Sequence, residues 1–271
     1  MIGLKIVALI LNYFKIFKKV KHINLMNTKT LILFDVDGTL TESRKVIKQN
    51  MVDTLKKLKT IDNLEIGIVG GSNLKKQKEQ LTEEYLKLFK YVFSENGLVA
   101  FKNDKLFHKM SIVKHVGEDN LKRLINTSLR YMSTLDIPVK RGTFVEFRNG
   151  MVNLCPVGRS CSQEERDEFF EFDNQNKVRE KMVEYLSEEL KDLGLSFSIG
   201  GQISIDVFPK GWDKTYCLQF VSGDYDKILF FGDRTMKGGN DYEIFNHELT
   251  IGYAVNSPEV TIKLLKEKFG L

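Results

Sequence analysis

The chain has 271 residues, of which 42% are hydrophobic and 28% are charged. This composition excludes a disordered or fibrous protein and indicates a soluble globular chain long enough for two domains. Five lysines within residues 1–26, a segment without acidic residues, account for the formal net charge of +5. The remaining 245 residues are formally neutral, so they give no electrostatic support for nucleic-acid binding. The three cysteines lack metal-ligand spacing and predict free thiols in a reducing compartment.

Residues 1–26 differ from the rest of the chain. The apolar run Ile6–Leu11 is too short to span a bilayer, and the lysines fall at helical spacing opposite apolar residues. We therefore expect a leader that is either disordered or an interfacial amphipathic helix, and residues 1–25 are the only segment predicted to contact a membrane. The alternative is that translation starts at Met26.

Apolar runs alternate with helical patterns on either side of a different middle segment. Strands that alternate with helices predict a doubly wound, Rossmann-like α/β sheet of parallel strands. The expected elements are strand 31–34, helix 46–59, strand 64–69, a helix ending near residue 90, a strand from residue 91, helix 213–221, strands 227–231 and 250–255, and a final helix.

The middle segment, residues 109–209, has a different pattern. Its expected elements are helix 118–135, strands 142–147 and 151–154, a long helix near 163–193, and strands 196–199 and 203–208. Asn149-Gly150 and Gly200-Gly201 are predicted as two-residue hairpin turns. These features predict an α+β cap domain with an antiparallel sheet, inserted into a core domain of residues 27–108 and 210–271.

Two carboxylates, Asp35 and Asp37, follow the first apolar strand at its carboxyl end. In an open α/β sheet this edge is where ligands bind, and alternation along an extended segment sends both side chains the same way. Gly38 permits a sharp turn that exposes backbone N–H groups to an anion. One carboxylate can attack phosphorus and the other can move a proton, so the pattern indicates phosphate chemistry. The alternative is an ordinary acidic turn.

The segment Asp35-Val36-Asp37-Gly38-Thr39 resembles the first motif of the haloacid dehalogenase superfamily of phosphoryl-transfer enzymes. The resemblance implies that Asp35 is the nucleophile and Asp37 the general acid/base. Ser72 matches the second motif, where it would bind a phosphate oxygen, although a serine there is also a natural helix cap. Lys214 matches the lysine of the third motif, although most lysines are simply solvated.

Asp233 matches the fourth motif of the same superfamily. The resemblance implies that it completes a Mg²⁺ site with Asp35 and the backbone carbonyl of Asp37. Ligation by oxygen alone favours Mg²⁺ over Zn²⁺. Asp241 is a candidate for a carboxylate that orients this site.

The middle segment is rich in arginine, the side chain best suited to grip phosphate. With one more arginine after the first motif, the set is Arg44, Arg141, Arg148, Arg159 and Arg166. So many arginines indicate a second phosphate bound away from the metal. The alternative is that several of them pair with Glu146, Glu164, Glu165 or Glu168 on a solvated face. Ser204 and Asp206 share one side of a strand and could bind sugar hydroxyls.

Longer segments resemble eukaryotic phosphomannomutases, in order and with few gaps from about Leu31 to Phe269. They are Phe34–Thr41, Arg141–Phe144, Glu146–Met151, Gly158–Arg166, Gly200–Ser204, Asp206–Pro209 and Phe231–Asp233. The resemblance implies a cytoplasmic isomerase that interconverts mannose 6-phosphate and mannose 1-phosphate and so supplies GDP-mannose synthesis. It also implies a homodimer joined through the cap and a hexose 1,6-bisphosphate activator that phosphorylates Asp35.

The resemblance also assigns binding residues. The sugar phosphate would be bound by Arg44, Arg148, Arg159, Arg166, Ser204 and Asp206. A second cation site is implied around Phe245, His247 and Thr250, with His247 in place of the usual acid. Two other functions use parts of the same residue set: a capped sugar-phosphate phosphatase and a non-enzymatic sugar-phosphate sensor. The cap arginines favour the mutase over the phosphatase, and Asp35, Asp37, Lys214 and Asp233 argue against the sensor.

Overall fold

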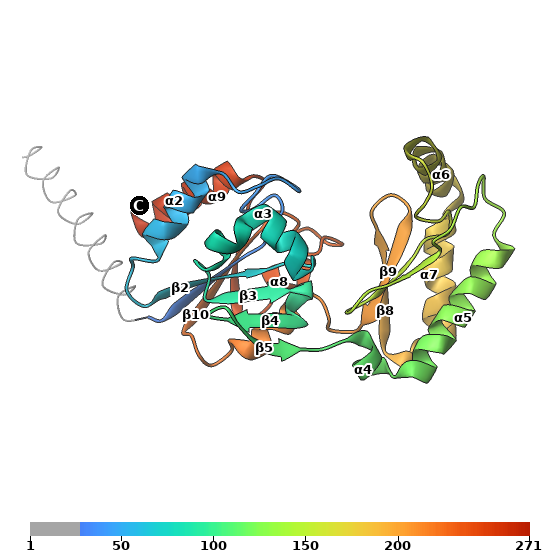
Figure 1. Ribbon diagram of the computed structural model, residues 1–271, viewed down its shortest axis with the longest axis horizontal. Helices are drawn as coiled ribbons and strands as arrows, with labels where there is room; N and C mark the ends of the chain where they lie inside the picture. Colours follow the sequence, from blue (N-terminus) through green and yellow to red (C-terminus); the bar gives the residue numbers. More distant parts are fainter. Residues whose placement is uncertain (1–27) are drawn as a thin grey trace, which may run out of the picture. The chain divides into compact units, whose positions relative to one another are not determined.

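The computed structural model describes residues 28–271, so the predicted leader lies outside the described residues. The chain divides into two compact units (Figure 1). The first unit contains the chain up to His108 together with Asp213–Leu271, and the second is Lys109–Trp212. Within residues 28–271, no helix is both long and apolar enough to cross a membrane.

The first unit contains a sheet of seven strands in the order β11-β10-β1-β2-β3-β4-β5. The strands are β1 (Thr30–Phe34), β2 (Leu64–Val69), β3 (Tyr91–Ser94), β4 (Val99–Lys102), β5 (Lys105–Lys109), β10 (Lys227–Gly232) and β11 (Thr250–Ala254). The five strands from β11 to β3 are parallel, and β4 returns antiparallel to β3. The predicted parallel core is therefore confirmed.

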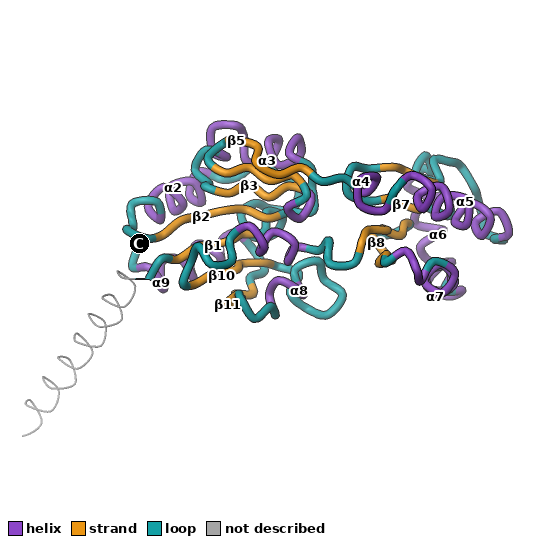
Figure 2. The backbone as a smooth tube through the Cα atoms, turned by 90° about the horizontal axis from the view of Figure 1, so that it is seen from below, coloured by secondary structure: helices purple, strands orange, loops and turns teal. Residues whose placement is uncertain are grey.

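Helices cover both faces of this sheet (Figure 2). They are α2 (Gln49–Leu58), α3 (Leu74–Leu86), α8 (Tyr242–Phe245) and α9 (Pro258–Phe269), with the 3₁₀ turns η1 (Glu95–Gly97) and η3 (Lys214–Phe220). Successive side chains of β1 point to opposite faces. Ile32 and Phe34 pack with α2, α3 and α9, whereas Leu31 and Leu33 pack with η3 and α8. Since both faces of β1 are buried, its sequence is continuously apolar, as is usual in doubly wound sheets.

The second unit contains an antiparallel sheet in the order β6-β7-β9-β8, accompanied by helices. Its elements are α4 (Ile112–Val116), α5 (Glu118–Thr134), β6 (Val145–Phe147), β7 (Val152–Leu154), α6 (Gln163–Asn176), α7 (Val178–Glu189), η2 (Lys191–Leu193), β8 (Leu195–Gly200) and β9 (Ser204–Pro209). The predicted α+β arrangement of this segment is present.

The single long helix predicted near residues 163–193 is wrong, because the chain breaks into α6 and α7 at Lys177. Lys177 has a left-handed backbone with φ of 57°. The break is stabilised by Asp173, whose carboxylate accepts hydrogen bonds from the backbone N–H of Arg179 at 2.8 Å and from its Nε at 2.6 Å. A side chain that binds the backbone of the next helix competes with helix continuation.

Two smaller expectations also differ from the structure. Gly200 pairs with Ser204, so the loop between β8 and β9 has the three residues Gly201–Ile203 and is not a two-residue Gly200-Gly201 turn. The helix expected at 213–221 is the 3₁₀ segment η3.

The left-handed backbone at Lys177 predicts an order of stability for substitutions there. We expect Lys177→Val to be less stable than Lys177→Gly by about 1–2 kcal/mol, because a side chain is unfavourable in the left-handed region and a β-branched one is worse. Thermal unfolding of both variants measures this. Lys181→Val, on the exposed surface of α7, is the matched control and should cost only about 0.5 kcal/mol. Equal stability of the two Lys177 variants would contradict the expectation.

Candidate active site

The centre of the site is a buried ammonium group that pairs with two carboxylates. Asp35 directly follows β1, and its backbone N–H donates to the carbonyl of Phe231 in β10 at 2.9 Å. Lys214, the first residue of η3, forms ion pairs with both Asp35 and Asp241. Its side chain is only 1% exposed, so the alternative of a solvated lysine is wrong.

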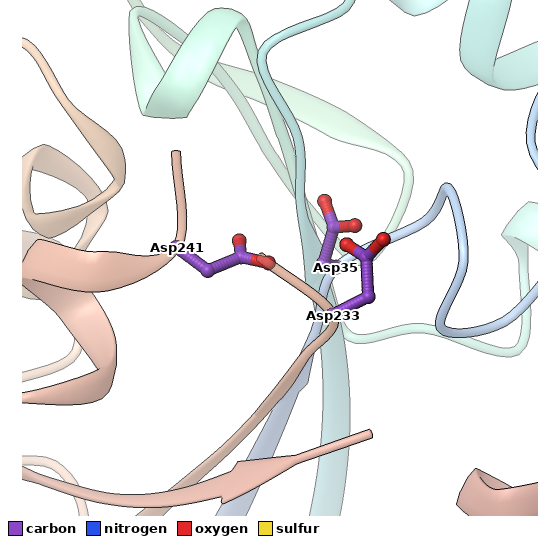
Figure 3. Close-up of side chains that lie close together, drawn as sticks. All are labelled: Asp35, Asp233 and Asp241. Carbon is purple, nitrogen blue, oxygen red and sulfur yellow. The ribbon is translucent and has the colours of Figure 1, made fainter. Parts of the chain in front are cut away.

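Three carboxylates lie together at the carboxyl end of the sheet, those of Asp35, Asp233 and Asp241 (Figure 3). One oxygen from each lies within 4.8 Å of the others. Asp35 follows β1, Asp233 follows β10, and Asp241 precedes α8. Three negative charges face the single positive charge of Lys214, so the group has an excess of two negative charges. An all-oxygen donor set with this excess suits a hard divalent cation.

The electrostatics of this group follow from its burial. Burial raises the pKa of Asp35 to about 7, with a further rise from the charge of Asp241, although Lys214 opposes both. Burial and the neighbouring Asp241 also raise the pKa of Asp233. Burial alone would lower the pKa of Lys214, but the two carboxylates outweigh it and raise that pKa. The carboxylates therefore lack compensating charge in the absence of a cation, while the lysine stays protonated.

Asp37 lies in a different environment from Asp35. Its Oδ1 accepts hydrogen bonds from the backbone N–H of Arg44 at 2.7 Å and from Nε2 of Gln80 at 2.8 Å. Gln80 is a buried residue of α3 that sequence reasoning missed. Its position could have identified it, because Gln80 and Gln77 lie on the buried face of an amphipathic helix, where apolar residues are usual. The two donors fix the orientation of the Asp37 carboxylate.

Asp35, Asp37 and Asp233 line a common cavity of about 300 Å³. It is lined by Asp35, Val36, Asp37, Ser43, Arg44, Gly70, Gly71, Ser72, Gln77, Gln80, Asp233, Arg234 and Asn240. The predicted Ser72 therefore lines the same cavity as Asp35 and Asp37. The alternative of Ser72 as a helix cap is wrong, because Asn73 caps α3 by accepting the N–H of Lys76 at 3.0 Å.

Gly38 is where the structure requires a glycine. Its φ is +73°, and a Cβ there would lie 2.7 Å from Cγ of Asp233. A side chain at this position would therefore strain the turn and displace the carboxylate. The sharp turn expected after Asp37 is thus also a close approach between two loops.

In the second unit, two of the predicted arginines share one carboxylate. Glu146 pairs with Nε of Arg148 at 2.7 Å through one oxygen and with Nε of Arg159 at 2.5 Å through the other. Arg141 pairs with Glu165. Among residues 28–271, Arg166 forms no ion pair with a carboxylate. Of the four arginines of this unit, Arg141, Arg148 and Arg159 therefore pair with a glutamate, as the alternative interpretation of the sequence expected.

Ser204 and Asp206 lie on β9 and contact the hairpin and the neighbouring strand. The hydroxyl of Ser204 donates to the carbonyl of Gly200 at 3.0 Å. Oδ1 of Asp206 accepts from the amide of Asn153 at 2.6 Å. Arg148, Arg159, Ser204 and Asp206 thus all belong to the second unit, whereas Arg44 belongs to the first.

The loop with the implied second cation site is closed by its own hydrogen bonds. The hydroxyl of Thr250 donates to the carbonyls of Ile244 at 2.5 Å and His247 at 3.1 Å. Nδ1 of His247 accepts from the N–H of Leu249 at 3.2 Å. Within residues 28–271, the side chains that could jointly hold a metal are Asp35, Asp233 and Asp241. The site around Phe245, His247 and Thr250 therefore stays a prediction.

Comparison with known proteins places the chain in a family. A family model described as eukaryotic phosphomannomutase matches residues 51–271. A phosphomannomutase of Galdieria sulphuraria is 55% identical over 252 residues, which cover 92% of this chain and 99% of that protein. The chain belongs to the eukaryotic phosphomannomutase family. Phosphomannomutase 2 of Dictyostelium discoideum is 54% identical over 245 residues and covers 90% of this chain and 98% of its own. The predicted family and its isomerase class are confirmed.

Solved structures of low sequence identity share the fold. IMP-bound, N-terminally truncated IMP-nucleotidase of Plasmodium falciparum aligns with a TM-score of 0.61 at 17% identity, covering 93% of this chain and 71% of that chain. Trehalose-6-phosphate phosphatase of Aspergillus fumigatus aligns with a TM-score of 0.61 at 12% identity, covering 90% and 94%. At these identities the likeness concerns the fold alone, and it agrees with the predicted fold class.

The raised pKa of Asp35 predicts a pH-dependent stability difference. With a chelator present, we expect Asp35→Asn to gain stability relative to the wild type between pH 5 and pH 8. The folded wild type binds more protons at Asp35 than the unfolded chain, whose aspartates titrate near pH 4, so its stability falls as pH rises toward 7. Thermal unfolding of both proteins at the two pH values tests this. An identical difference at both would contradict it.

Proposed function

We propose that this protein is a phosphomannomutase that interconverts mannose 6-phosphate and mannose 1-phosphate. The observation that carries the proposal is that Asp35 and Asp37 line one cavity in contrasting environments, in a chain of this family. Asp35 is paired with a buried ammonium group, whereas Asp37 is held by two neutral N–H donors. Two carboxylates in different surroundings suit two different roles.

Asp35 is the nucleophile in this mechanism. Lys214 holds its Oδ1, so we assign the attack on phosphorus to Oδ2. The new bond from Oδ2 to phosphorus forms as the bond from phosphorus to the sugar oxygen breaks, which leaves an aspartyl phosphate. The ammonium of Lys214 opposes protonation of Asp35 and would offset negative charge on the transferring group.

Asp37 is the general acid/base. Its Oδ1 already accepts two hydrogen bonds, so we assign the proton to Oδ2. This proton passes to the sugar oxygen as it leaves, and in the reverse direction Asp37 takes the proton of the attacking hydroxyl. Gln80 positions Asp37 for this transfer, while Ser72 would bind an oxygen of the phosphate.

The residues present fit a Mg²⁺ ion. Asp35, Asp233 and the backbone carbonyl of Asp37 would hold it, because the group offers only oxygen ligands and an excess of negative charge. When bound, the cation would offset charge on the transferring phosphoryl group. Asp241 also accepts hydrogen bonds from Lys214 and from the N–H of Arg234 at 3.0 Å, so we propose that it supports the site.

The second unit would bind the part of the substrate that does not react. Arg148, Arg159 and Arg166 would grip the distal phosphate, with Arg44 in the first unit, while Ser204 and Asp206 would bind sugar hydroxyls. A hexose 1,6-bisphosphate would first phosphorylate Asp35, and the same molecule forms as the intermediate. It must turn around between the half-reactions, so the arginines must bind either phosphate.

A capped sugar-phosphate phosphatase is the second candidate, since the fold is shared with trehalose-6-phosphate phosphatase. The arginines of the second unit favour the mutase, because hydrolysis of one phosphate does not require a second anion site. Supply of GDP-mannose synthesis, a cytoplasmic location and a homodimer joined through residues 109–209 stay predictions of the same resemblance.

The proposal predicts different defects for the two aspartates. Asp35→Asn should abolish mutase turnover and phosphoenzyme formation, because an amide is a poor nucleophile. Asp37→Asn should still be phosphorylated slowly by a bisphosphate but should transfer to the sugar at least about 100-fold more slowly, the usual scale of acid/base catalysis. A coupled assay with mannose 1-phosphate, Mg²⁺ and hexose 1,6-bisphosphate measures turnover. Phosphate release without isomerisation would favour the phosphatase instead.

The cation site predicts a shift in thermal stability. Mg²⁺ at 100 times its dissociation constant should stabilise the wild type by about 2.7 kcal/mol, since it binds only the folded state. Asp233→Asn should lose most of this gain, because it removes a charged ligand. Thermal unfolding with and without Mg²⁺ is the measurement. Asp226→Asn, at an exposed carboxylate outside the site, is the control and should keep the full gain. An equal gain in both variants would contradict this assignment.

A further inference from the structure

Glu146 occupies a place among the arginines that the proposed substrate binding does not explain. It lies on β6 opposite Asn153 of β7, which lies opposite Asp206 of β9. Residues opposite one another in a sheet share a face, so these three side chains form a row across the strands. The carboxylate of Glu146 thus lies on the same face of the sheet as Asp206, one of the residues assigned to the sugar phosphate.

Glu146 contacts the same atom, Nε, in each arginine. Nε of Arg148 and Nε of Arg159 bind one oxygen each. An arginine has five N–H donors, and a contact through Nε uses one of them. Nη1 of Arg148 contacts Sδ of Met151 at 3.8 Å and Nη1 of Arg159 donates to Asn153, so a second anion would bind chiefly through the Nη2 groups. The side chains of all three residues are between 33% and 38% exposed, so an anion from solvent can reach them.

The backbone around both arginines is fixed independently of Glu146. The N–H of Arg148 donates to the carbonyl of Met151 at 2.9 Å, and the N–H of Arg159 donates to that of Thr143 at 3.1 Å. Nη1 of Arg159 also donates to Oδ1 of Asn153 at 2.8 Å. Loss of the Glu146 charge would therefore leave the backbone of both arginines in place but change the net charge of the three-residue group from +1 to +2.

We propose that Glu146 is a built-in counter-ion that limits how tightly Arg148 and Arg159 hold a phosphate. The inference rests on the proposed function, in which a bisphosphate must be released and bound again in the opposite orientation. Binding that is equally strong in the ground state and the transition state does not speed the reaction, and excess ground-state binding of the intermediate slows its release. Glu146 thereby lowers the affinity for phosphate and raises the turnover rate.

The test compares Glu146→Gln with the wild type in full-length protein. We expect Glu146→Gln to bind inorganic phosphate about three- to tenfold more tightly, measured by calorimetry with a chelator present, because a nearby opposing charge is lost. In the mutase assay, kcat and the KM for mannose 1-phosphate should both fall. A purely structural role would raise KM instead. Arg148→Gln should lose the phosphate binding, which verifies that the arginine pair is the site observed.

Two further variants separate charge from other effects. Glu165→Gln removes the same charge from the neighbouring pair with Arg141 and should leave phosphate affinity within about twofold of the wild type. Glu146→Asp retains the charge and should also stay near the wild type. Unchanged or weaker phosphate binding by Glu146→Gln overturns the proposal, as does tight binding by Glu146→Asp. If the wild type lacks mutase activity, the proposed function fails, while the phosphate measurement still decides the counter-ion role.

Discussion

The ion pairs of Lys214 with Asp35 and Asp241 are the interaction on which the catalytic unit depends. An isolated charge in this position would be very costly, and removing one partner of a buried pair typically costs about 3–5 kcal/mol. The lysine joins three loops, because Asp35 follows β1, Lys214 begins η3 and Asp241 precedes α8. The same contact therefore joins the loops at the carboxyl end of the sheet and holds Asp35, the proposed nucleophile. We therefore expect substitutions of Lys214 to change stability and activity together.

Residues close in sequence were the easiest to predict. The apolar strand before Asp35 and the turn at Gly38 follow from local pattern and steric limits, and the structure has both. Strand β2 lies where its apolar run predicts. The parallel sheet followed from the alternation of strands and helices, since parallel neighbours need a crossover. Such features depend on a few neighbouring residues, and the sequence contains that information directly.

Features that depend on distant side chains could not be predicted from pattern alone. The hydrogen bond from Gln80 to Asp37 joins residues 43 positions apart, and nothing in the helix identifies its partner. The break between α6 and α7 depends on Asp173 and Arg179, which are six residues apart, a spacing at which side chains do not meet on a continuous helix. To predict that Arg148 and Arg159 share Glu146, one would need to know the register of the strands. In each case a charged or amide group binds a partner that only the folded chain brings within reach.

The buried pair of Asp173 and Arg179 has a consequence for how the second unit unfolds. Nη1 of Arg179 also donates to the carbonyl of Gly201 at 2.9 Å, so the start of α7 is bound to the turn between β8 and β9. Fraying of that turn would break the charge-assisted hydrogen bonds from Arg179 to the carbonyls of Gly201 and Ser204, which makes separate opening of the hairpin unfavourable. We therefore expect the start of α7 and the β8–β9 hairpin to open together. Ser204, one residue beyond the turn, gains the rigidity of a helix terminus although it lies at the end of a strand.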